Sequence, residues 1–163
     1  MMEIHKDLLM HSLYESAPMA VIVVGQDGRI YHANAAAEET FGYQRSEMVG
    51  QPLGILIPAR FRQAHQQWLE IYFKHFQQRP MGGGKKLLAQ RKDGSEFPSE
   101  IGLSSITLQG EIFAAAYIAD ITVRVQAEEE LAQYARELEA QNYLSRFASN
   151  FSNSGRPTKK LRR

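Results

Sequence analysis

The chain has 163 residues, of which 44% are hydrophobic and 23% are charged, and its formal net charge is +1. These fractions are typical of a folded globular protein and exclude the collagen-like and intrinsically disordered classes. The length accommodates one domain of ordinary size with about thirty residues of extension.

The sequence contains no cysteine. This excludes disulfides, cysteine-ligated zinc, iron–sulfur clusters and thiolate nucleophiles. No apolar run approaches the ~20 residues of a membrane-spanning helix, and the N-terminus has no leader pattern. We therefore expect a cytoplasmic protein without a membrane span.

The basic residues are unevenly placed, with five of them in the last eight positions. The Ser, Gly and Pro around them favour a disordered basic tail over 152–163. Nucleic-acid binding would also require a basic folded face, so we do not expect it.

The hydrophobic pattern changes between helical and strand spacing along the chain. In chain order it predicts a helix over 1–16, strands over 19–25 and 29–33, helices over 35–41, 46–50 and 60–77, strands over 85–91, 96–106 and 111–121, and a helix from 122 to 151. The segment 78–84, with Pro80 and three glycines, is expected to be a loop. Hairpin-linked strands on both sides of a helical insert imply an α+β fold, with a five-stranded antiparallel sheet and the helices on one face.

Six short motifs share their order and spacing with a known family. They are Ala17–Val24, Asp27–Ile30, Asn34–Tyr43, Glu47–Gly50, Arg91–Pro98 and Asp120–Thr122. With them, residues 13–122 resemble a PAS domain of bacterial sensor kinases and diguanylate cyclases. We therefore expect a flanking helix over 1–16, a PAS domain over 17–122, a signalling helix over 123–151 and the tail described above. The resemblance implies a two-component-type sensory or protein-interaction module, not an enzyme, with any output domain in a larger parent protein.

Asp120 and Thr122 lie where the last predicted strand becomes the exit helix. We expect the Thr122 hydroxyl to cap that helix by accepting a hydrogen bond from a first-turn amide. In similar PAS domains this junction carries the signal outward. The two residues are therefore predicted to be the signal junction.

The helix over 60–77 carries an apolar stripe formed by Phe61, His65, Trp68 and Tyr72. FixL-type oxygen-sensing PAS domains, which this region resembles, have a haem-ligating histidine on the same helix. The resemblance implies a pocket whose candidate cofactor-binding residues are His65, Trp68, Tyr72, Arg79, Ile101 and Leu103. A structural histidine on a partly exposed helix is the alternative.

Two positions depart from the haem-binding pattern. Lys85 replaces a distal arginine of those domains, and Ile71 replaces an arginine that binds a haem propionate, although Arg79 could serve one propionate. The cofactor therefore stays unknown, with haem and a non-covalently bound flavin both open. A cysteinyl-flavin adduct is excluded, and no metal-ligand spacing or catalytic motif is present apart from haem iron at His65.

The exit helix carries a short coiled-coil seam at Ala127, Leu131, Tyr134 and Leu138, flanked by charged residues. This spacing predicts a homodimer, and a helix folded back on its own sheet is the alternative. Three functions stay open: a dimeric sensor that relays the binding of a small molecule or partner, a haem-based gas or redox sensor, and a ligand-free dimerisation scaffold.

Overall fold

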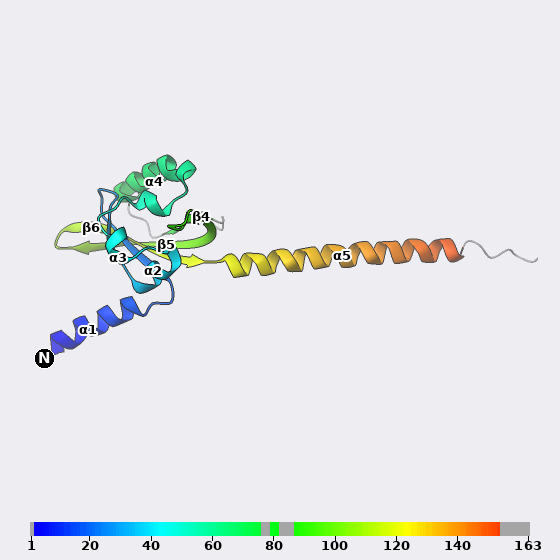
Figure 1. Ribbon diagram of the computed structural model, residues 1–163, viewed down its shortest axis with the longest axis horizontal. Coiled ribbons are helices and arrows are strands. Elements are labelled where there is room, and N and C mark those ends of the chain that lie inside the picture. The colour runs from blue at the N-terminus through cyan, green and yellow to red at the C-terminus, as the bar shows by residue number, and fades with distance from the viewer. Residues whose placement is uncertain (1, 76–78, 82–86, 154–163) are drawn as a thin grey trace, which may run out of the picture. The chain divides into compact units, whose positions relative to one another are not determined.

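The structure is a computed structural model that describes residues 2–75, 79–81 and 87–153. The chain divides into two units after Thr122, and the second unit holds the exit helix. The elements are α1 (Met2–Glu15), β1 (Ala20–Val24), β2 (Ile30–Ala33), α2 (Ala35–Phe41), α3 (Arg45–Met48), the 3-10 turns η1 (Leu53–Leu56) and η2 (Ala59–Phe61), α4 (Arg62–His75), β3 (Arg79–Met81), β4 (Leu87–Gln90), β5 (Glu96–Leu108), β6 (Glu111–Asp120) and α5 (Thr122–Asn153) (Figure 1).

The strands form one antiparallel sheet with the order β2-β1-β6-β5-β3, and β4 pairs with the same strand, β5, as β3 does. β3 pairs with 101–103 and β4 with 96–99, so the two short strands follow one another along one edge of β5. The sheet thus has the five strand positions that were predicted, together with the N-terminal and C-terminal flanking helices.

The expected loop over 78–84 is wrong for part of its length, because residues 79–81 form β3. Pro80 has no N–H to donate, but an edge strand tolerates proline because only one side of it is paired. The predicted strand over 85–91 is correspondingly shorter and spans Leu87–Gln90 as β4. Residues 78 and 82–86 lie outside the described residues.

Local sequence signals explain most element boundaries. Asn34 caps α2, and Gly42 ends it in the left-handed conformation at φ 74°. Helix α3 begins at Arg45, one residue before the predicted turn, because Gln44 and Glu47 form a capping box. At the tip of the β5–β6 hairpin, Gln109 and Gly110 both have positive φ, as a two-residue hairpin turn requires.

One buried cluster joins the helices to a single face of the sheet. It contains alternate residues of β1 and β6 together with residues of α2, α3 and η1, namely Ala20, Ile22, Val24, Ala116, Ile118, Ala37, Phe41, Met48 and Leu56. The Phe41 and Phe97 rings pack against each other at 5.6 Å in this cluster. Because the residues of one strand face alternate sides, the short helices lie on one face of the sheet, as predicted.

Helix α5 is one uninterrupted helix that begins at Thr122, as predicted, and ends two residues later than expected (Figure 1). Within the ranges given above, none of the helices has the length and apolarity that crossing a membrane would need.

Candidate functional site

Asn34 is fully buried, and its side chain holds three segments of the first unit together. Its Oδ1 accepts hydrogen bonds from the amides of Val21, at 2.9 Å, and Ala37, at 3.0 Å. Its Nδ2 donates to the carbonyls of Tyr14 and Met19, each at 3.1 Å. One side chain therefore ties the end of α1 and the residue before β1 to β1 and to the start of α2.

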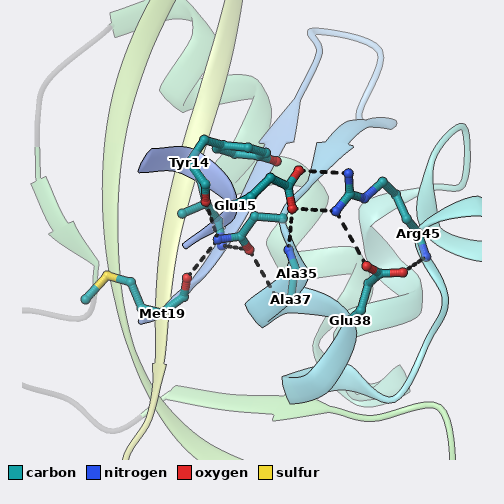
Figure 2. Close-up of polar contacts among 9 residues, drawn as sticks. Tyr14, Glu15, Met19, Ala35, Ala37, Glu38 and Arg45 are labelled. Carbon is teal, nitrogen blue, oxygen red and sulfur yellow. Dashed lines mark hydrogen bonds and ion pairs between the residues drawn. The ribbon is translucent and has the colours of Figure 1, made fainter. Parts of the chain in front are cut away.

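A second polar group fixes the end of α1 to the short helices (Figure 2). The Arg45 guanidinium donates to both carboxylate oxygens of Glu15, at 2.8 and 2.7 Å, and the amide of Ala35 donates to the same carboxylate. Glu38 accepts from the Arg45 backbone amide at 2.7 Å and lies 3.5 Å from its guanidinium. The hydrogen bond from Arg45 is the main reason why the pKa of Glu15 lies below its usual value.

The predicted signal junction is a hydrogen-bonded unit. One Asp120 carboxylate oxygen accepts from the Thr122 amide at 2.9 Å and from the Thr122 hydroxyl at 2.5 Å. The other oxygen accepts from Arg91 at 2.6 Å. Burial alone would raise the pKa of Asp120, but the hydrogen bonds from Thr122 and Arg91 outweigh it and leave that pKa lowered.

The Thr122 hydroxyl donates to the same Asp120 oxygen that accepts from the Thr122 amide, so the carboxylate links the end of β6 to the first residue of α5. That this hydroxyl also accepts from a first-turn amide stays a prediction. The negative charge at the start of α5 also suits the positive end of the helix dipole.

Arg91 connects this junction with the core. Its guanidinium lies 4.0 Å from the centre of the Phe97 ring and donates to the carbonyl of Thr40 near the end of α2. Phe97 in turn packs against Phe41 of α2. A continuous set of contacts therefore leads from a core helix, through Arg91, to Asp120 at the end of β6, two residues before α5 begins.

A cavity of about 280 Å³ lies beside the same junction. Its walls come from the segment before β1, the end of α2 and the end of β6, and they consist of Pro18, Met19, Thr40, Ile118, Ala119 and Asp120. The cavity therefore adjoins Asp120, which sequence reasoning had assigned only to the junction.

The buried face of helix α4 differs from the predicted apolar stripe. His65, Leu69, Tyr72 and Phe73 are half-buried, whereas the Trp68 side chain is 62% exposed. Phe61, in the preceding η2 turn, is 43% exposed. Burial lowers the pKa of His65, which keeps its imidazole neutral at neutral pH.

Two of the predicted cofactor-binding residues lie on β5. Ile101 and Leu103 of β5 are partly buried and pack against the same core cluster as Leu69 of α4. The backbone of Arg79 pairs with Leu103 in the β3–β5 register. The Arg79 side chain and Lys85 belong to the part of the chain that is not described.

Among the residues described, no group of three or more His, Asp or Glu side chains is arranged to hold a metal ion. In the second unit, the predicted dimer seam is exposed: Leu131 is 69% exposed, Tyr134 61% and Leu138 42%, and Ala127 is exposed as well.

Comparison with known proteins agrees with this architecture. A family profile described as "PAS domain" matches residues 18–123, which include the sheet, the short helices and the Asp120–Thr122 junction. The chain belongs to the PAS domain family. This confirms the predicted family and fold, and the PAS domain is the sensory domain of signal-transduction proteins.

Two bacterial relatives resemble the PAS domain of this chain. The oxygen sensor protein DosP of Escherichia coli K12 is 27% identical over 119 residues, which are 73% of this chain and 15% of that protein. The sensor protein FixL of Bradyrhizobium diazoefficiens is 28% identical over 129 residues, which are 79% of this chain and 26% of FixL. The aligned PAS region is thus about a quarter or less of each relative.

Solved PAS structures have the same fold. The PAS domain of an HTR-like protein from Haloarcula marismortui superimposes with a TM-score of 0.63 at 25% identity, covering 73% of this chain and 94% of that one. An RNA-binding light-oxygen-voltage receptor has a TM-score of 0.60 at 20% identity, covering 82% and 38% of the two chains. The second likeness shows the fold alone.

Proposed function

We propose that this PAS domain senses the binding of a small molecule or a protein partner, and that Arg91, Asp120 and Thr122 relay the resulting change to α5. The observation that carries the proposal is the Asp120 carboxylate, which accepts from Arg91 with one oxygen and from Thr122 with the other. A shift of Arg91 therefore changes the hydrogen bonds that hold the first turn of α5.

A movement of the core can displace Arg91, because its guanidinium lies over the Phe97 ring and donates a hydrogen bond to the Thr40 carbonyl near the end of α2. A binding event that displaces β5 or α2 would change both contacts at once. Packed interiors transmit such displacements because they contain few voids that could absorb them.

The relay needs a recipient, and we propose that a second copy pairs with α5 through its exposed seam. The matched region makes up only 15% of DosP and 26% of FixL, which supports a longer parent protein in which α5 leads to an output domain. Any catalysis would then belong to that output domain, and a cytoplasmic location fits the lack of cysteine.

A cavity introduced into the sheet wall tests the relay. Leu103→Ala removes buried volume next to the core, whereas Leu108→Ala changes an exposed side chain, 54% accessible, on the same strand. We expect faster amide hydrogen exchange over 122–130 with Leu103→Ala and wild-type exchange with Leu108→Ala. The effect of Leu103→Ala should disappear in an Arg91→Ala background. If it persists there, the relay does not pass through Arg91.

Haem binding at His65 is a second candidate. The half-buried, neutral imidazole on α4 suits an axial ligand to iron, and Leu69, Ile101 and Leu103 add apolar side chains packed against the core cluster. The similarity to the oxygen sensor DosP supports the same assignment. Bound haem would supply a centre for a gas or a redox change, and His65 would hold its iron. Ile71, 51% exposed, offers no charge for a propionate.

Absorption spectroscopy separates the candidates. Titration of haem into the purified protein should give a Soret shift that His65→Ala abolishes and that His75→Ala, an exposed histidine of the same helix, leaves unchanged. Flavin bands in the freshly purified protein would indicate a flavin instead. Absence of visible bands, before and after titration, would favour a colourless small molecule or a ligand-free scaffold.

A further inference from the structure

The cavity beside Asp120 is formed by three separate segments of the first unit. Its walls are residues 18–19 before β1, Thr40 of α2 and residues 118–120 at the end of β6. Pro18 and Met19 are exposed whereas Ile118 is buried, so the cavity leads from the surface to the edge of the core. A small molecule in solution can therefore enter it while the domain stays folded.

Hydrogen bonds hold all three walls of the cavity in place. The Met19 carbonyl accepts from Asn34 at 3.1 Å. The Thr40 carbonyl and the Asp120 carboxylate both accept from the guanidinium of Arg91. Sites that bind small molecules are usually preformed, because little conformational freedom is then lost when the ligand enters. These hydrogen bonds therefore give the cavity a fixed shape before any ligand binds.

The polar chemistry of the walls calls for a hydrogen-bond donor. Asp120 is the one ionisable residue among the wall residues, and its lowered pKa keeps it ionised at neutral pH, so its carboxylate can only accept. A carboxylate has about four positions for donors. In the described part of the chain, Oδ1 accepts the amide and hydroxyl of Thr122 and Oδ2 accepts Arg91. A further donor therefore finds an acceptor position on Oδ2.

The charges around the cavity favour a neutral ligand. Arg91 lies 2.6 Å from Asp120 and already balances its charge, so it would repel a second cation bound beside it. The carboxylate itself would repel an anion. Met19, Ile118 and Ala119 make much of the wall apolar, so a charged ligand would also lose hydration without compensation.

The volume of the cavity limits the size of the ligand. At about 280 Å³ the cavity lies below the roughly 300–1,000 Å³ of pockets that hold drug-sized molecules. It therefore suits a molecule built on one ring or on a short chain.

We propose that this cavity binds a small, neutral, largely apolar molecule whose single O–H or N–H group donates to Asp120 Oδ2. The bound donor shares Oδ2 with Arg91 and so weakens the ion pair between Arg91 and Asp120. The inference rests on the proposed relay, to which it gives a ligand class and a binding site. That site is separate from the surroundings of His65, because no residue of α4 belongs to its walls.

Benzyl alcohol tests the inference, because it combines one hydroxyl group with one apolar ring. Its titration into the full chain, followed by amide NMR, should give saturable shifts at residues 118–120. Toluene has the ring without the donor, and it should bind at least about fivefold more weakly because the hydrogen bond to the carboxylate is lost. Benzylamine, which is charged at neutral pH, should also bind more weakly than benzyl alcohol.

Filling the cavity should prevent binding. Ala119→Leu adds apolar volume from β6 and Thr40→Leu adds it from α2, and each should abolish the shifts caused by benzyl alcohol. Two variants on different elements guard against the misfolding of one of them. The matched control Thr107→Leu, at an exposed position of β5, should bind as the wild type does.

Three results would overturn the inference: no saturable shifts at 118–120, wild-type affinity in the filled variants, or tighter binding of benzylamine than of benzyl alcohol. All three leave the proposed relay intact, because Leu103→Ala tests the relay without a ligand. When benzyl alcohol binds, amide exchange over 122–130 should accelerate, by up to about the fivefold that loss of a helix cap would cause. Binding with unchanged exchange would support the site and contradict the relay.

Discussion

Glu15 at the end of α1 and Arg45 at the start of α3 form a two-pronged ion pair with distances of 2.8 and 2.7 Å. The pair joins the flanking helix to the short helices of the PAS domain, next to Asn34. Because Arg45 keeps a side-chain exposure of 40%, solvent screens the pair, and its effect should be on the attachment of α1 more than on global stability.

This pair predicts a pH dependence. The pKa of Glu15 is lowered in the folded state, so its contribution is complete above the ordinary pKa of glutamic acid and is lost as the pH falls through the lowered value. Amide exchange over 8–15, corrected for the intrinsic rate, should therefore accelerate in acid in the wild type. Glu15→Gln should exchange faster at neutral pH and lose that dependence, whereas Glu39→Gln, at an exposed position of α2, should behave as the wild type. Equal acid sensitivity in Glu15→Gln would contradict the assignment.

Asn34 is predicted to be the most sensitive polar position in the first unit. Asn34→Ala leaves the Val21 amide and the carbonyls of Tyr14 and Met19 without the partners they have in the wild type. Each buried polar group left unsatisfied costs about 1–3 kcal/mol, so the free energy of unfolding should fall by about 3 kcal/mol or more. Urea denaturation measures it, with Asn142→Ala, exposed on α5, as the control.

Asn34→Asp sharpens the same test. A carboxylate at this position keeps the acceptor for Val21 and Ala37 but faces two carbonyls without a proton to donate. Burial and these carbonyls should raise its pKa, so the variant should regain stability as the pH falls below that raised value. A loss below 1 kcal/mol for Asn34→Ala, or no recovery of Asn34→Asp in acid, would show that the four hydrogen bonds are not the cause.

The exposed seam of Ala127, Leu131, Tyr134 and Leu138 on α5 predicts a homodimer in solution. Leu131→Glu combined with Leu138→Glu places like charges across a symmetric interface and removes apolar burial worth ~1.5–3 kcal/mol for each leucine. Sedimentation should shift toward the monomer while helical circular dichroism is retained. The matched control Gln133→Glu, outside the seam, should sediment as the wild type. An unchanged dimer in the double variant would place the interface elsewhere.

Sequence reasoning succeeded where the signal is local. Asn34 caps α2 and Gly42 ends it because each acts on backbone groups within a few residues. The same holds for Thr122, where α5 begins and whose amide and hydroxyl both donate to Asp120. The strand at 79–81 was missed because its partner, β5, comes some twenty residues later in the chain and proline argued against a strand.

The contacts that join distant parts of the domain could not be predicted from the sequence in this way. Arg91 reaches Asp120 across 29 positions, and Arg45 reaches Glu15 across 30. No spacing rule connects residues so far apart, and the sequence offers many other arginines and acids. Trp68 shows the complementary limit, because helical spacing gives a stripe but not the direction in which it is turned.

The central claim is that Arg91 and Asp120 act together on the first turns of α5. Hydrogen exchange of residues 122–130 should be compared in the wild type, Arg91→Ala, Asp120→Ala and the double variant, with Arg29→Ala as the control on an exposed arginine. Loss of a helix cap costs ~1 kcal/mol, so each single variant should exchange roughly fivefold faster. The double variant should be no faster than the faster single one, since both changes remove the same interaction. Wild-type exchange in Asp120→Ala, or additive effects of the two changes, would contradict the relay.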